Sequence, residues 1–372
     1  MGAHAKPAGL FVCASCVMLA ACIPSSASQD VHNAAHQLVS LDAKRVQGSS
    51  QHTYASSLHR FVKWATDKAK LPIDKVLPPG KRGVVDPGLV RLFMAWASAR
   101  YKASTIESTL SALKDWHKSK GADHSHLNED PIKQLLHSIK VEQGPEGLPK
   151  GKVGMTKPLL RLLVKYLAVK RDTSDPGERR LHVRDLVWVL LGFYGMLRRS
   201  ELIALTMDDI QVGSEDGRSF VEMTIRRSKT DQRGAGALVT ISGISTDQIT
   251  ISDYVHLWLA HRTNMGATPS DPLFPAWNLD SRGLSNLPIK TGQALAARLK
   301  LHLTSLVQSH PGISVNPEAY GMHSLRRGGV MAAWQAGVPV EKIKAHGRWQ
   351  SDAVRAYMHT TRSMRLQVTH GM

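Results

Sequence analysis

Cysteine is scarce in this sequence of 372 residues, which has only three, Cys13, Cys16 and Cys22, all close to the N-terminus. No cluster of other metal-ligating residues matches them, so neither a zinc site nor a disulfide framework is indicated. The sequence also lacks a P-loop, a His-Glu-x-x-His motif and a clustered set of carboxylates. We therefore expect no metal site, no cofactor and no ATP-driven chemistry.

Acidic residues are outnumbered, with 30 Asp and Glu against 48 Lys and Arg, so the formal net charge is +18. A surplus of this size indicates a polyanionic partner, and double-stranded DNA is the leading one. Eight Trp residues and 42% hydrophobic residues argue against a disordered basic tail. The positive charge therefore belongs to folded structure, and 372 residues favour two domains.

The first 30 residues differ from the rest, because Lys6 and Asp30 are their only charged residues and residues 9–23 are an apolar run. This leader imitates a secretory signal, and residues 19–22 imitate a lipoprotein cleavage site. One interpretation is an exported lipoprotein whose basic surface meets anionic envelope partners. The other is a spurious extension of an intracellular, DNA-associated protein, nuclear in a eukaryote and in the cytoplasm or nucleoid of a bacterium. Beyond Ile23 no apolar stretch could cross a bilayer, so no membrane partner is expected.

Residues 31–142 carry a helical pattern and predict a small helical domain. One apolar stripe at helical spacing consists of Tyr54, Leu58, Phe61 and Ala65. A second helix is predicted to start at Ser104, which forms a capping box with Glu107. Further helices are expected around residues 92–96 and over residues 131–141.

A domain boundary is predicted over residues 143–154, which are rich in Gly and Pro and contain Lys150 and Lys152. Residues 155–372 form the second domain. Alternation over residues 221–225 and 238–241, with turn residues at 231–236, predicts a β-hairpin. Helices are expected over residues 157–169, 183–194, 252–262, 292–310, 324–335, 340–345 and 352–359. The predicted fold class is mainly α with a small β-hairpin or sheet (α+β).

Two basic segments lie next to predicted core. Arg198 follows a strongly apolar run, and Glu201, three residues on, can orient its guanidinium while leaving donors for a ligand oxygen. An ordinary structural ion pair is the alternative. His323 and Arg326 also lie three apart at a predicted helix start, where an arginine near a helix N-terminus suits a phosphate. A solvated pair on an exposed helix is the alternative there.

The predicted hairpin and the C-terminal region add further groups. Arg226, Arg227 and Lys229 gather at the hairpin turn, where a lysine can protonate a departing oxygen and where basic side chains can also simply bind DNA. Ser351 is a helix N-cap that would present Tyr357. A tyrosine can act as a covalent nucleophile when cations hold an acceptor phosphate in line with it.

In this order, Arg198 within Leu-Arg-Arg-Ser-Glu-Leu, a hairpin lysine, His-x-x-Arg and a C-terminal tyrosine resemble the tyrosine recombinase family, also called phage integrases. The resemblance covers about residues 50–360. It implies that residues 31–142 are a SAM-like core-binding domain for DNA and that residues 155–372 are the catalytic domain. The Gly-Arg-Trp-x-Ser-Asp-Ala run at 347–353 looks closest to mobile-element recombinases of the crypton and DIRS-like type.

The resemblance implies a role for each matched residue. Tyr357 would be the nucleophile, Arg198 and Arg326 the phosphate clamps, Lys229 the acid for the leaving 5′ hydroxyl, and His323 an aid to proton transfer. The sixth position is ambiguous: spacing from the nucleophile points to Arg348 and residue type to Trp349, which we prefer as an indole N–H donor. Glu201 and Arg348 are expected to support the site. Lys150, Lys152, Arg226 and Arg227 are expected to bind DNA.

The resemblance implies metal-independent cleavage and rejoining of DNA through a 3′-phosphotyrosine, by a homo-oligomer, expected to be a tetramer, on DNA. A type IB topoisomerase would share this chemistry, and a domesticated DNA-binding module would lack it. A two-site plasmid assay and a suicide DNA substrate, respectively, would separate these alternatives.

Overall fold

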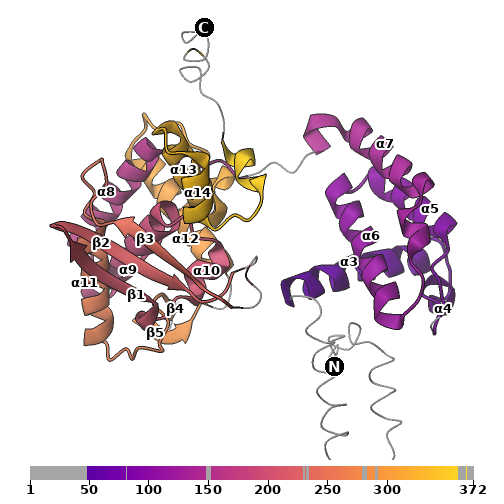
Figure 1. Cartoon of the computed structure of the whole chain (residues 1–372), viewed down its shortest axis with the longest axis horizontal. Coiled ribbons are helices and arrows are strands. Elements are labelled where there is room, and N and C mark those ends of the chain that lie inside the picture. The colour runs from indigo at the N-terminus through magenta and orange to yellow at the C-terminus, as the bar shows by residue number, and fades with distance from the viewer. Residues whose placement is uncertain are drawn as a thin grey trace, which may run out of the picture. The chain divides into compact units, whose positions relative to one another are not determined.

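The computed structural model describes residues 48–80, 82–147, 152–228, 231, 234–278, 283–289, 292–358 and 366. The chain divides into two compact units, residues 1–150 and 151–372 (Figure 1). The predicted leader and two predicted site residues, Lys150 and Lys229, lie outside the described residues. In the part of the chain that is described, no helix has the length and apolar character needed to span a membrane.

The first unit is helical. Its elements are α3 (Gly48–Asp67), α4 (Ile73–Val76), α5 (Pro87–Ser98), α6 (Ala103–Lys120), the 3-10 turn η1 (Ser125–Asn128) and α7 (Asp130–Gly147). Aromatic side chains of α3 and α5 form much of its core, with the Phe93 ring centroid 5.3 Å from those of Phe61 and Trp64. The predicted helical stripe faces this core, where Leu58, Phe61 and Ala65 are buried and Tyr54 is partly buried.

The predicted capping box at Ser104 and Glu107 is wrong. Helix α6 begins one residue earlier, at Ala103, and no side chain of its N-cap residue caps it. Instead, Gln143 of α7 accepts the Ala103 N–H at 2.8 Å and donates to the carbonyls of Ser98 and Tyr101, both at 2.9 Å. Because Ala103 is buried, the helix start meets a neighbouring helix, and that helix supplies the acceptor.

Helix α7 also runs past its predicted end at residue 141 to Gly147. Gly144, with φ 52°, interrupts its regular geometry, a conformation that glycine adopts without steric cost.

The second unit is built around one buried helix, α9 (Pro176–Tyr194), whose residues 181, 183–193 are buried. It contacts α8, α11 and α13. The helices of this unit, besides α9, are α8 (Lys157–Thr173), α10 (Arg199–Ala204), α11 (Ile251–Asn264), α12 (Gly292–Ser309), α13 (Met322–Gln335) and α14 (Val340–Gly347), with 3-10 turns η2 (Met207–Asp209), η3 (Pro317–Ala319) and η4 (Asp352–Tyr357).

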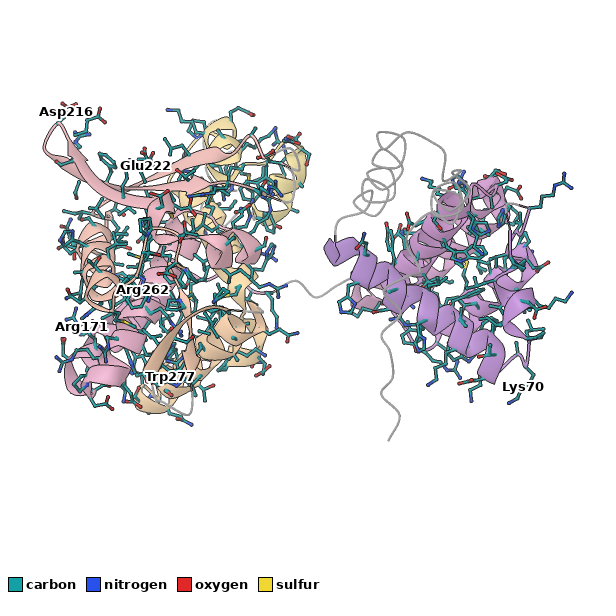
Figure 2. All side chains as sticks on the ribbon, turned by 90° about the horizontal axis from the view of Figure 1, so that it is seen from below. Lys70, Arg171, Asp216, Glu222, Arg262 and Trp277 are labelled. Atoms are coloured by element: carbon teal, nitrogen blue, oxygen red, sulfur yellow. The ribbon has the colours of Figure 1, made fainter. Side chains whose placement is uncertain are left out.

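Two small antiparallel sheets complete the second unit. Strands β1 (Ile210–Glu215), β2 (Arg218–Ile225) and β3 (Ala237–Ser242) pair in that order, and β4 (Pro275–Asn278) pairs with β5 (Gly283–Pro288). Val221, Met223 and Ile225 alternate toward the core, as predicted for β2, while Asp216 lies at the outer tip of the β1–β2 turn (Figure 2). The predicted fold class, mainly α with a small sheet, is confirmed, although the predicted helix at 352–359 is a 3-10 turn.

A buried carboxylate joins α9 to α12. Asp185 accepts hydrogen bonds from Arg184, from the Trp188 indole at 2.9 Å, and from Arg298 and His302 at 2.8 Å each. The charges of these neighbours outweigh the effect of burial and hold the pKa of Asp185 well below its ordinary value. The network therefore ties a charged group of the central helix to the helix that covers it.

The first described residues of the second unit are bonded to η3 and to the start of α13. The Val153 N–H donates to the Ala319 carbonyl at 3.0 Å and the Met155 N–H to the Ser324 carbonyl at 2.8 Å. The Lys152 ammonium donates to the Glu318 carbonyl at 2.7 Å. This segment is thus fixed beside the helix that carries His323 and Arg326.

Candidate active site

Arg198 is the N-cap residue of α10, directly after a turn that ends α9. Its backbone N–H donates to Glu201 Oε2 at 2.8 Å, and its Nη1 donates to Glu201 Oε1 at 2.7 Å. The carboxylate of Glu201 is completely buried, whereas the side chain of Arg198 is 18% exposed. The predicted pairing is therefore present, and it leaves part of the guanidinium open to a ligand.

Arg326 is buried because α13 packs closely on α9. A Cβ added at Gly328 would lie 2.1 Å from the Met155 carbonyl oxygen, and one at Gly329 would lie 2.2 Å from the Phe193 carbonyl oxygen. Only glycine allows this approach. The Arg326 guanidinium then donates to the carbonyls of Met196 and Gly347, the latter at 2.7 Å.

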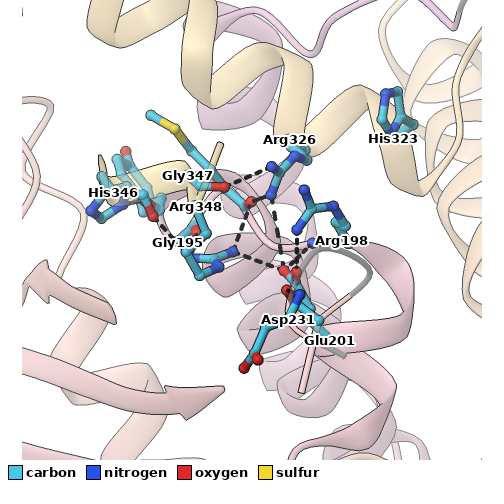
Figure 3. A network of polar contacts seen from close by, with 12 residues as sticks. Gly195, Arg198, Glu201, Asp231, His323, Arg326, His346, Gly347 and Arg348 are labelled. Carbon is cyan, nitrogen blue, oxygen red and sulfur yellow. Dashed lines mark hydrogen bonds and ion pairs between the residues drawn. The ribbon is translucent and has the colours of Figure 1, made fainter. Parts of the chain in front are cut away.

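A third arginine, Arg348, ends α14 in the left-handed conformation with φ 59°. Its Nη2 donates to Glu201 Oε2 at 2.8 Å, and its Nη1 donates to the His346 carbonyl at 2.9 Å. Figure 3 shows the resulting arrangement, in which Arg198, Arg326 and Arg348 surround the single carboxylate of Glu201. Burial raises the pKa of Glu201, but the charge of Arg348 and the hydrogen bonds from Arg198 lower it by more.

Tyr357 lies at the end of η4, which Ser351 caps as predicted through a hydrogen bond from the Ala353 N–H at 3.4 Å. The Tyr357 hydroxyl lies 2.8 Å from Nε2 of His323. The Trp349 ring centroid is 5.9 Å from that of Tyr357, and the Arg326 guanidinium lies 3.7 Å from the Trp349 ring centroid. Trp349 is therefore packed between the tyrosine and a buried arginine.

Two pKa values in the site are displaced. The His323 ring reaches the surface, yet partial desolvation lowers its pKa, and the charges of Arg326 and Arg327 lower it further. Burial, followed by the charge of Arg198, lowers the pKa of Arg326 to about 9. At pH 7 to 8 the His323 imidazole is thus neutral and can accept a proton, while the Arg326 guanidinium is charged and can bind an anion.

Of the predicted DNA-binding residues that are described, Arg226 and Arg227 line a pocket with Glu201. Lys152 is bonded to the loop before α13, Arg227 is exposed, and Arg226 forms ion pairs with Asp208 and Asp209. These ion pairs would compete with DNA phosphates for the charge of Arg226, and the sequence did not indicate them.

Asp231 organises the turn between β2 and β3. Its carboxylate accepts the N–H groups of Gly234, Ala235 and Gly236 at 2.9, 3.1 and 2.8 Å. These hydrogen bonds lower the pKa of Asp231, and the bond from the Gly236 N–H has the largest effect. Lys229, two residues earlier, lies outside the described residues, so its predicted role as an acid stays a prediction.

The structure brings together side chains from three regions that are far apart in sequence: Arg198 with Glu201, His323 with Arg326, and Arg348, Trp349 and Tyr357 near the C-terminus. Sequence reasoning missed the carbonyl of Met196, which accepts from both Arg326 and Arg348. No side-chain pattern signals such an acceptor. Sequence reasoning also assigned Asp231 only to a turn. An aspartate with Gly-Ala-Gly three residues further on, at 234–236, is typical of a carboxylate that accepts hydrogen bonds from successive backbone amides.

No family model matches the chain. A protein of Selenomonas ruminantium named integrase/recombinase XerD homolog is 24% identical over 255 residues, which are 68% of this chain and 66% of that protein, just under two thirds. Two solved structures are similar at 14% identity. XerH site-specific recombinase bound to palindromic difH gives a TM-score of 0.58, covering 98% of this chain and 95% of XerH. Tn1549 transposon integrase with transposon right end DNA gives 0.57, covering 91% and 97%.

At 14% identity, these structural likenesses show the fold of the chain. That fold is the tyrosine recombinase/integrase fold, which the chain shares with XerH and the Tn1549 integrase.

Proposed function

We propose that this protein cleaves and rejoins DNA strands through a covalent 3′-phosphotyrosine formed on Tyr357. The observation that carries the proposal is the convergence of one phenol with a group of arginines, of which Arg326 is buried and Arg198 and Arg348 are partly buried. The Tyr357 hydroxyl is bonded to His323, and its ring packs on Trp349, which covers Arg326. The fold shared with XerH and the Tn1549 integrase, and the XerD homolog as a sequence relative, support the same activity.

The reaction follows from what each group offers. The Tyr357 oxygen attacks a backbone phosphorus, its proton passes to neutral His323, and the bond from phosphorus to the 5′ oxygen breaks. Arg198 and Arg326 offset the charge on the non-bridging oxygens, as preorganised cations do for a phosphoryl transition state. Lys229 gives its proton to the leaving 5′ oxygen. Attack of a 5′ hydroxyl of another strand on the phosphotyrosine reverses these steps and joins the new partner.

The partner in this proposal is double-stranded DNA, bound by a homo-oligomer, with a tetramer as the assembly that exchanges strands. XerH and the Tn1549 integrase were each solved with DNA. In this chain, Lys150, Lys152, Arg226 and Arg227 would contact the DNA, the first unit would act as the core-binding domain and the second as the catalytic domain. Such a substrate places the protein inside the cell. The basic balance of +18 supports phosphate binding.

A narrower placement, among crypton and DIRS-like recombinases, rests on the Gly-Arg-Trp-x-Ser-Asp-Ala run at 347–353. The relatives named above are of the XerD, XerH and Tn1549 types and give this placement no support of their own.

Replacement of Tyr357 by Phe tests the proposal. The ring and its packing on Trp349 are kept while the nucleophilic oxygen is removed, so Y357F should bind DNA as the parent protein does and form no adduct. The measurement is trapping on a nicked suicide DNA substrate, read as a protein–DNA band in a denaturing gel, with mapping of the linked peptide. An adduct that survives in Y357F, or that maps to another residue, would reject the assignment of Tyr357.

A further inference from the structure

Arg348 occupies the position that spacing from the nucleophile assigns to a phosphate donor, yet its surroundings point to another use. We propose that Arg348 is a positioning residue that holds Glu201 and sets the net charge of the arginine pocket, without touching the DNA phosphate. The inference rests on the proposed function, because it concerns the pocket that would bind the scissile phosphate.

Both terminal nitrogens of Arg348 are already engaged, whereas its Nε is buried and has no hydrogen-bond partner among the described residues. Nη2 donates to Glu201 Oε2 at 2.8 Å and to the Met196 carbonyl at 3.3 Å, and Nη1 donates to the His346 carbonyl at 2.9 Å. The side chain is 9% exposed, half the value for Arg198. A phosphate could bind Arg348 only by displacing these buried acceptors, and each displaced acceptor would be left unsatisfied. Arg198 offers a more open guanidinium for the same task.

The charge of Arg348 has a specific target. Glu201 orients Arg198 through two hydrogen bonds, but its negative charge also weakens the attraction of the pocket for a phosphate. Arg348 lies 2.8 Å from the same carboxylate and offsets that charge. The pocket of three guanidinium groups and one carboxylate therefore keeps two net positive charges, which act through Arg198 and Arg326.

Arg348 also supports the turn that precedes Arg198. Met196 has φ 46°, a left-handed conformation that is costly for a side chain of this size. Its carbonyl accepts from both Arg326 and Arg348, so the two guanidinium groups stabilise the turn in this conformation. The same side chain thus holds the carboxylate and the backbone that orient Arg198.

A double-mutant cycle with Glu201 tests the inference. The quantity measured is the first-order rate constant of adduct formation on the suicide substrate, with the burst amplitude recording the fraction of active molecules. Met at position 348 keeps the bulk of the stem and removes the charge, so R348M should slow adduct formation about 100-fold, the loss typical of a misplaced reacting geometry. DNA affinity should change by less than about 3-fold, because many other phosphate contacts supply it.

The second substitution restores the charge balance. E201Q removes the carboxylate that Arg348 offsets, so E201Q/R348M should react faster than R348M, by about 10-fold, and R348K should fall between R348M and the parent protein. R171M, which removes an arginine paired with Asp172 on α8, is the matched control and should react at the parental rate.

Each outcome is distinguishable. No adduct from the parent protein would remove the proposed function itself. An R348M rate within 3-fold of the parent, or losses in E201Q and R348M that multiply in the double variant, would overturn the role of Arg348 while leaving Tyr357 as nucleophile. A lower burst amplitude with an unchanged rate constant would mean that Arg348 serves folding alone, which also overturns it.

Discussion

At the scale of single residues, the pairing of His323 with Tyr357 would give the proposed reaction a defined pH dependence. The pKa of His323 lies below its ordinary value of 6.5, so the imidazole is neutral at pH 7 and can accept the phenol proton. As pH falls through the lowered pKa, the imidazole becomes protonated and loses this capacity. A base in contact with its proton donor typically contributes about 10²- to 10⁴-fold in rate.

We therefore expect the rate constant of adduct formation to be level near pH 7 to 8 and to fall on the acid side, with its midpoint below 6.5. H323Q should lower the plateau by about 100-fold and abolish the acid limb. Single-turnover rates from pH 5 to 8 on the suicide substrate measure both. An acid limb that persists unchanged in H323Q would assign the titration to another group.

Side-chain pairs in this site could be predicted from the sequence because they rest on local spacing. Glu201 follows Arg198 by three residues, and the helical geometry of α10 brings the two together. The meeting of these residues with Arg326, Arg348 and Tyr357 depends on how α13 and α14 pack, which spacing does not determine. For this reason, the sequence alone could not decide whether Arg348 or Trp349 takes the sixth position.

At the scale of helices and strands, the Asp185 network connects two elements of the second unit. Asp185 of α9 is fully buried, and its carboxylate pairs with Arg298 and His302 of α12. These two contacts hold α12 against α9. Removal of the carboxylate leaves the buried guanidinium of Arg184 and the partly exposed one of Arg298 without a counter-charge, which costs about 3–5 kcal/mol.

D185A should accordingly lower the free energy of unfolding of the second unit by about 3–5 kcal/mol. Urea titration followed by circular dichroism gives the loss, and hydrogen exchange in peptides of α9 and α12 locates it. D172A is the control, since Asp172 pairs with Arg171 at the surface and its removal should leave the unfolding midpoint unchanged. A similar midpoint for both variants would show that the network does not stabilise the unit.

Elements were predictable where periodicity was strong. Strands β2 and β3 followed from alternation and turn residues, and the helical ranges of α8, α9, α11 and α12 from apolar spacing. Strand β1 was not predicted because its burial pattern does not alternate cleanly. The start of α6 was predicted wrongly because its cap comes from Gln143, 40 residues away in sequence. Tertiary contacts decide such features, and they leave no local signal.

At the scale of the whole molecule, the excess of 18 positive charges would govern the encounter with the proposed DNA partner. Each phosphate contact releases condensed counterions, so affinity falls steeply with salt. For 6 to 10 contacts, the expected loss between 50 and 200 mM salt is about 10³- to 10⁵-fold.

Fluorescence anisotropy with labelled duplex DNA at several salt concentrations measures this slope. Arg227 is exposed, so R227Q should reduce the slope by about one unit if it contacts a phosphate, and it should weaken specific and non-specific duplexes alike. A salt slope near zero in the parent protein would contradict phosphate contacts as the source of affinity.

The hydrogen bonds of Val153 and Met155 to the loop and helix start around α13 have a mechanical consequence. Together with the Lys152 ammonium, these amides fix the described start of the second unit to residues 318–324, and Ser324 directly follows His323. A displacement of this segment would therefore reach the residue next to His323.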